Sequence, residues 1–136
     1  MVDFRAILLD GSYHEVDSNE MAFRIAASMA YKSGLERAKP TILEPIMEVE
    51  IFTPEEYLGD LISDLMGRMG RVERVEDRHG GKVVRANVAL RLLFGYTTRL
   101  RSLSQGRANH TMQFSFYQPT PQTVQDEIVR KVRGAT

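Results

Sequence analysis

The order of hydrophobic periodicities between Pro45 and Tyr117 is the feature that most constrains the fold of this sequence. Alternating apolar residues predict strands, and apolar residues every three or four positions predict helices. In order, the predicted elements are a strand through Met47, Val49 and Ile51, a helix from Thr53 to about Met66, strands over Arg71–Arg78 and Lys82–Leu90, a helix over about Leu92–Ser104, and a strand through Met112, Phe114 and Phe116. This βαββαβ order predicts an α+β protein with a ferredoxin-like split βαβ domain.

Local signals mark the ends of several of these elements. Thr53-Pro54-Glu55-Glu56 predicts a helix start, with threonine as the N-cap, proline at the first helical position and Glu56 reaching back. Gly67 and Gly70 predict the end of that helix. His79-Gly80-Gly81 predicts a hairpin turn, because φ > 0 is available to both glycines.

The first forty residues predict only part of a domain. Alternating apolar residues over 2–9 predict a strand, which Asp10-Gly11 ends. Asp17 followed by Glu20 resembles a capping box and predicts a helix over about Ser18–Ala38. One strand and one helix cannot bury their apolar faces alone, so we expect a partial βα unit here.

The side chains that most often carry chemistry are absent or scattered. There is no cysteine, which excludes disulfides and thiolate metal sites. His14, His79 and His110 have no partners at ligand spacing, so we expect no metal and surface or turn positions for these histidines. Gly81-Lys82 is followed by Val83 rather than by the hydroxyl residue of a P-loop, and no serine has the context of a nucleophile elbow. We therefore expect that this chain is not an enzyme.

Targeting signals are also missing from the sequence. No apolar run approaches the roughly 20 residues that span a bilayer, so we expect no membrane association. The start of the chain does not resemble a signal peptide. These features predict a soluble cytoplasmic protein.

Charge is distributed unevenly along a chain whose formal net charge is zero. Residues 1–64 carry 13 acidic and 5 basic side chains, whereas residues 68–107 carry 10 basic and 3 acidic ones. Nine of those ten cations are arginines, which bind phosphate and stack on bases better than lysine does. This pattern fits either a nucleic-acid contact or an ordinary solvated face.

Two segments are candidate binding features. Residues 11–15 join serine, tyrosine and histidine on a turn, a composition suited to RNA but also found in ordinary polar turns. Residues 99–107 place three arginines around a predicted helix end, and Arg68, Arg71 and Arg74 could add to their field. The central strands offer no aromatic residues for base stacking, so RNA contact should come from helix ends and loops.

The sequence resembles elongation factor G, a bacterial-type translational GTPase, over about residues 2–117. Residues 9–23 read LDGSYHEVDSNEMAF, which is similar to the signature of the fourth domain of that family. Further matching motifs follow in the family's order: Leu43-Glu44-Pro45-Ile46-Met47, Thr53-Pro54-Glu55-Glu56-Tyr57, Gly59-Asp60, Phe94-Gly95-Tyr96, Leu100-Arg101-Ser102 and Gln105-Gly106-Arg107. The chain departs from the family at three positions, Met69, Arg99 and Phe116.

The resemblance implies a domain organisation and a set of partners. Residues 1–40 would be the C-terminal part of domain four, residues 41–118 domain five, and residues 119–136 a helix, predicted over about Gln122–Arg133, that packs back on domain four. The expected partner is the ribosome: tRNA and the small-subunit decoding centre for the tip, and the stalk base and sarcin–ricin loop of large-subunit rRNA for domain five. The chain would act as a monomer during translocation. GTP and Mg²⁺ would belong to the parent's G domain, so no cofactor is expected here.

The resemblance also implies which residues make these contacts. His14 is the expected principal residue of the tip. The tip residues are Ser12, Tyr13, His14 and Asp17. The candidate rRNA contacts are Arg68, Arg71, Arg99, Arg101, Ser102, Gln105 and Arg107.

Three alternatives remain open from the sequence. One is a ferredoxin-like regulatory or ligand-binding module, which would be stabilised by a small ligand and would not bind RNA in a salt-sensitive way. A second is an enzyme on an α+β scaffold, which lacks a catalytic cluster. The third is a paralogue within the family, specialised for ribosome recycling or drug protection, although the intact tip signature argues against drug protection.

Overall fold

The computed structural model describes residues 1–134, and the chain divides into two compact units, Met1–Pro40 and Thr41–Thr136. The N-terminal unit contains one helix, α1 (Glu20–Arg37). The C-terminal unit contains the strands β1 (Leu43–Thr53), β2 (Arg71–Arg78), β3 (Gly81–Ala89) and β4 (Asn109–Pro119), and the helices α2 (Leu58–Gly67), α3 (Tyr96–Leu103) and α4 (Gln122–Val132).

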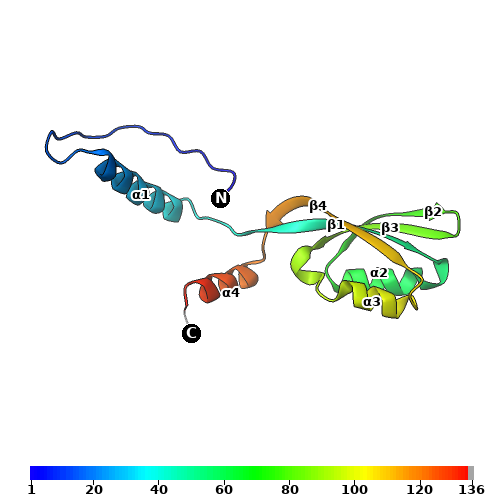
Figure 1. Ribbon diagram of the computed structural model, residues 1–136. Helices are drawn as coiled ribbons and strands as arrows, with labels where there is room; N and C mark the ends of the chain where they lie inside the picture. The colour runs from blue at the N-terminus through cyan, green and yellow to red at the C-terminus, as the bar shows by residue number, and fades with distance from the viewer. Residues whose placement is uncertain (135–136) are drawn as a thin grey trace. The chain divides into compact units, whose positions relative to one another are not determined.

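The four strands form one antiparallel sheet with the order β2-β3-β1-β4. Strand β1 is central, and Val49 pairs with Ala86 of β3 on one side and Met112 of β4 on the other. Helices α2 and α3 lie together on one face of this sheet (Figure 1). The element order and the sheet confirm the predicted ferredoxin-like α+β fold of this unit.

The core of the C-terminal unit lies between the sheet and these two helices. Val49 and Ile51 have no exposed surface, because alternate residues of β1 face the helices. Each fully buried side chain of this size contributes about 1.5–3 kcal/mol relative to an exposed one. The buried residues of β3, α2 and α3 that form the core together with Val49 and Ile51 are Val84, Ala86, Val88, Leu61, Leu65, Tyr96 and Leu100.

The hairpin between β2 and β3 uses its two glycines differently. Gly80 adopts φ = 88°, as the turn requires. Gly81 is instead the first residue of β3, and a Cβ atom there would lie 2.4 Å from the carbonyl oxygen of Thr53. The prediction that both glycines adopt positive φ is therefore wrong. Gly81 is needed instead because the backbone of β1 lies too close for a side chain at this position.

The predicted capping role of Thr53 is also wrong. Thr53 is fully buried at the end of β1, where it pairs with Lys82, and its hydroxyl donates to the carbonyl of Pro54 at 3.1 Å. The chain then enters a 3₁₀ turn, Glu55–Tyr57, that no side chain caps. Strand pairing fixes Thr53 before the helix starts, so its hydroxyl cannot reach the helix amides.

The helix that was predicted to start near Leu92 begins later, at Tyr96. A 3₁₀ turn, Leu90–Leu92, and Gly95 in the left-handed region (φ = 71°) come first. Glycine accepts this backbone conformation without a steric penalty, which allows the chain to turn sharply into α3.

The N-terminal unit differs from the prediction in two ways. Residues 2–9 form no strand, because a strand needs a hydrogen-bonding neighbour and none of the described residues pairs with them. Helix α1 is capped by Asn19, whose Oδ1 accepts from the amide of Ala22 at 2.8 Å, and not by the predicted Asp17–Glu20 box. No residue of 1–40 is buried, so the apolar side chains of this unit remain largely exposed.

Among the described residues no helix is long and apolar enough to cross a membrane.

We predict that Gly81→Ala destabilises the chain by about 1–3 kcal/mol, because the new methyl group would overlap the backbone of β1. Gly59→Ala is the matched control, since Gly59 lies in α2 with open space around its Cα and alanine favours helix by about 0.5–1 kcal/mol. Urea unfolding of both variants measures the difference, and equal stabilities would contradict the close approach of Gly81 to Thr53.

Candidate nucleic-acid interface

The predicted tip forms a closed turn before α1. The amide of His14 donates to Oγ of Ser18 at 2.7 Å, and the amide of Ser18 donates back to the carbonyl of His14 at 2.9 Å. At the start of the turn, the amide of Gly11 donates to Oδ1 of Asp10 at 2.7 Å. These local bonds order the tip without any buried side chain.

The four predicted tip residues, Ser12, Tyr13, His14 and Asp17, are all exposed, and they lie together on this turn. The exposed fraction of Tyr13 is 66%. Exposed hydroxyl, phenol and imidazole groups can donate to phosphate or base edges or stack on a splayed base. Ser18 was not predicted as a tip residue, although serine frequently binds nearby backbone groups in turns, which is the signal that could have revealed it.

A second candidate surface is the turn that joins α3 to β4. Ser104 is fully buried, and its hydroxyl donates to the carbonyl of Leu100 at 2.7 Å and accepts from the amide of Ala108 at 3.1 Å. Gln105 and Gly106 follow in the left-handed region, with φ of 52° and 77°. Ser104 therefore fixes the turn from inside; its role was not predicted, because sequence alone does not show that this serine is buried.

This turn brings four of the predicted rRNA residues together. Arg101, Ser102, Gln105 and Arg107 are all exposed around it. A hollow of about 310 Å³ opens beside Arg101. It is lined by Thr97, Leu100, Arg101, Gly106, Ala108, Asn109 and His110. Its polar groups suit an anionic, hydrogen-bonding ligand better than an apolar one.

Arg68 lies inside the C-terminal unit and is not part of this turn. Its side chain is 19% exposed, its Nε pairs with Asp64 at 3.0 Å, and its Nη1 donates to the carbonyls of Leu92 at 2.8 Å and Phe94 at 3.2 Å. These contacts use the guanidinium to hold the approach to α3 against α2.

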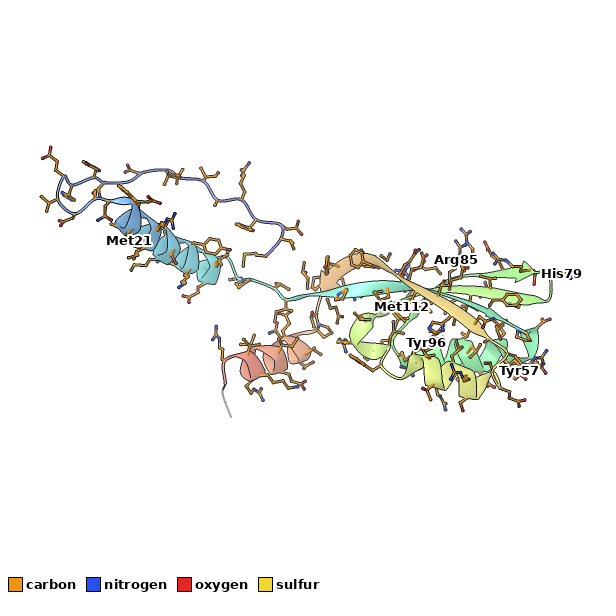
Figure 2. All side chains as sticks on the ribbon, in the orientation of Figure 1. Met21, Tyr57, His79, Arg85, Tyr96 and Met112 are labelled. Carbon is orange, nitrogen blue, oxygen red and sulfur yellow. The ribbon has the colours of Figure 1, made fainter. Side chains whose placement is uncertain are left out.

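The ring of Tyr96 completes this arrangement beneath the sheet (Figure 2). The guanidinium of Arg68 lies 5.2 Å from the ring centroid, and His110 meets the ring edge-on at 5.4 Å. Burial and the nearby carboxylate of Asp64 raise the pKa of the Tyr96 phenol far above its usual value. The Tyr96 ring acts as a packing group against Arg68 and His110.

The exposed arginines differ in whether a carboxylate forms an ion pair with the guanidinium. Arg99 pairs with Asp64 at 3.3 Å, Arg71 with Glu73 at 3.2 Å, and Arg107 with Glu56 at 2.7 Å. The Arg107 guanidinium also lies 5.9 Å from the ring of Tyr57 (labelled in Figure 2). Glu56, predicted as a capping residue, is therefore an ion-pair partner.

Arg101 is the exception among the predicted arginines, because no carboxylate of residues 1–134 lies within ion-pair distance of it.

Arg71 lies apart from this turn, on β2, where its neighbour Val72 packs against the core. Arg71 therefore faces the open side of the sheet, on the wall of a separate hollow of about 470 Å³.

The described residues offer little for bond-making chemistry. Within residues 1–134 no three histidine, aspartate or glutamate side chains are grouped so that they could hold a metal ion. The C-terminal unit is a ferredoxin-like α+β domain with an arginine-bearing turn, and the N-terminal unit presents an exposed polar tip. Each unit, taken by itself, therefore presents an exposed polar surface.

Comparison with known protein families identifies the chain. Residues 1–39 match the model of elongation factor G, domain IV, and residues 41–128 match that of the elongation factor G C-terminus. The chain therefore belongs to the elongation factor G family, as the sequence motifs predicted.

Individual relatives agree with this assignment. Elongation factor G of Thermotoga maritima is 58% identical over 132 residues, and that of Thermotoga petrophila is 55% identical; each match covers 97% of this chain. A crystal structure of a Thermus thermophilus protein superimposes with a TM-score of 0.82 at 38% identity over 93% of the chain. The chain spans 19% of the length of these relatives.

We predict that Arg68→Gln destabilises the chain by about 2–4 kcal/mol, because a partly buried carboxylate and two carbonyls lose their donor. Arg99→Gln is the control: it removes an ion pair with the same Asp64, but from a side chain that is 54% exposed, and should cost less than about 1 kcal/mol. Thermal and urea unfolding measure both effects. A cost for Arg99→Gln as large as that for Arg68→Gln would contradict the structural role given to Arg68.

Proposed function

We propose that this chain is the tRNA-facing and rRNA-facing part of a ribosomal translocation factor. The observation that carries the proposal is the exposed, turn-closed tip with the family's signature residues. In the proposed mechanism GTP hydrolysis takes place in the G domain of the parent protein. The 136 residues would transmit that event as a lever and wedge, in which insertion of the tip biases the movement of tRNA and mRNA.

The tip would contact tRNA and the small-subunit decoding centre. Ser12, Tyr13, His14 and Asp17 all lie on the exposed turn, and none is buried against the rest of its unit. The imidazole of His14 has two ring nitrogens that can hydrogen-bond to phosphate, ribose or a base edge. His14 is therefore the residue we expect to matter most.

The turn between α3 and β4 would contact large-subunit rRNA at the stalk base and sarcin–ricin loop. Arg101 would supply the main phosphate contact, since no intramolecular carboxylate within residues 1–134 competes for its guanidinium. Ser102, Gln105 and Arg107 would add hydrogen bonds around it. Arg99 and Arg71 would contribute less to rRNA binding, because each is already paired with a carboxylate that would compete with phosphate for its guanidinium.

The domain assignment follows the same proposal. Residues 1–40 would end domain four and residues 41–118 would form domain five. Helix α4 would pack back on domain four, a role supported by its exposed apolar residues Ile128, Val129 and Val132. The chain would carry no cofactor of its own, since GTP and Mg²⁺ would bind the G domain of the parent. It would act as part of a monomeric, cytoplasmic factor.

The proposal is tested by His14→Ala in Thermotoga maritima elongation factor G whose matched segment is replaced by this chain. We expect translocation to slow by about tenfold or more, because loss of one or two hydrogen bonds to RNA corresponds to about 1.5–3 kcal/mol. Ribosome-stimulated GTP hydrolysis should remain within about twofold of the unsubstituted protein, since the tip is separate from the G domain.

Glu15→Ala is the matched control, because Glu15 is exposed on the same turn and has no assigned contact. Rapid-kinetic measurement of tRNA–mRNA movement and of phosphate release separates the two activities. Equal losses of translocation and GTP hydrolysis in His14→Ala, or an unchanged translocation rate, would overturn the proposed role of the tip.

A further inference from the structure

Ser18 occupies both backbone groups of His14, the residue proposed above to matter most at the tip. The His14 amide donates to Ser18 Oγ at 2.7 Å, and the His14 carbonyl accepts from the Ser18 amide at 2.9 Å. Two bonds of opposite direction between the same two residues close the segment 14–18 into a ring. We refer to this pair of bonds as the Ser18 clasp.

The clasp has little help from packing. Residues 14–17 are all exposed, and the exposed fraction of Val16, in the middle of the segment, is 91%. Among residues 1–134 no buried side chain supports this turn, in contrast to the buried Ser104 that fixes the turn in the C-terminal unit. In such a segment the local hydrogen bonds decide which backbone conformation is populated.

The clasp also joins the tip to a rigid element. Ser18 directly precedes Asn19, the N-cap of α1, whose Oδ1 accepts from the amide of Ala22 and whose carbonyl accepts from Phe23 at 3.0 Å. A side chain held on a helix end is better oriented than one on an open loop. Because side-chain rotamers depend on the backbone angles, fixing the backbone of His14 restricts the directions that its imidazole can take.

We propose that Ser18 is a positioning residue that acts through His14: its hydroxyl holds the tip closed so that the imidazole meets RNA in one preorganised orientation. This inference rests on the proposed function of the tip. Preorganisation raises the rate because the loop need not be ordered when the tip engages RNA. The Ser18 hydroxyl, which accepts from the His14 amide, is therefore required for fast translocation although it does not itself contact RNA.

The test compares Ser18→Thr with Ser18→Val in the Thermotoga maritima factor carrying this chain. Threonine and valine have nearly the same shape, but only threonine keeps the Oγ acceptor. We expect Ser18→Val to slow translocation by about five- to tenfold, which corresponds to the loss of one hydrogen bond of about 1–1.4 kcal/mol, and Ser18→Thr to retain most of the rate. GTP hydrolysis should change in neither variant.

A double-mutant cycle with His14→Ala separates positioning from an independent contact. If Ser18 acts through His14, adding Ser18→Val to His14→Ala should slow translocation by less than about twofold further. Additive losses, or equal rates for Ser18→Thr and Ser18→Val, would overturn the inference while leaving the role of His14 intact. An unchanged rate for His14→Ala alone would instead refute the proposed function, and the inference with it.

Amide hydrogen exchange provides a readout that does not depend on activity. In a peptide spanning residues 12–18, Ser18→Val should raise the exchange rate of the protected tip amides by about tenfold, whereas Ser18→Thr should leave it near the unsubstituted value. Peptides from the C-terminal unit serve as the internal control, because they should exchange alike in all variants. Equal exchange of the tip peptide in both variants would contradict the clasp.

Discussion

The pairing of β1 on both of its edges is the constraint on which the C-terminal unit depends. Strands β3 and β4 use the backbone groups on either side of β1, and alternate β1 residues then face α2 and α3. This geometry buries Val49 and Ile51 completely and requires glycine at position 81 beside Thr53. Helix α3, which carries Arg101, packs on this face, and the turn after it leads into β4, which pairs with β1.

The two candidate surfaces are held by different physical means. In the C-terminal unit a hydrophobic core and the buried hydroxyl of Ser104 fix the arginine turn. In the N-terminal unit no residue is buried, and short-range hydrogen bonds from Ser18 and Asn19 order the tip. A surface held by local bonds can be reshaped by a single substitution, whereas one held by a core resists it.

The sequence predicted the order of elements in the C-terminal unit well, because each strand and helix there has its own hydrophobic period. Strand β2 has the predicted bounds, Arg71–Arg78. The strand expected over residues 2–9 does not form, since alternation shows which face is apolar but cannot supply a pairing partner. The predicted capping role of Thr53 was wrong for a related reason. A capping pattern is local in sequence, whereas Thr53 pairs with β3, which follows much later in the chain.

The candidate site was less predictable than the fold. Sequence motifs placed Arg101, Ser102, Gln105 and Arg107 around one helix end, and in the structure they lie at the end of α3 and in the turn after it, because they are close together in the chain. They could not distinguish Arg68 from the other arginines, because its partners Leu92 and Phe94 are 24 and 26 residues away. Charge compensation is likewise a property of the folded chain, since Glu56 neutralises Arg107 across a separation of 51 residues.

We propose that Arg101 is the principal phosphate contact of the C-terminal unit. The most direct test is the salt dependence of ribosome binding by Thermotoga maritima elongation factor G carrying this chain, with Arg101→Ala compared to Arg99→Ala. Loss of one phosphate contact lowers the slope of log affinity against log salt concentration by about one. We expect this change for Arg101→Ala and almost none for Arg99→Ala. Equal slopes in the two variants, or a larger change for Arg99→Ala, would contradict it.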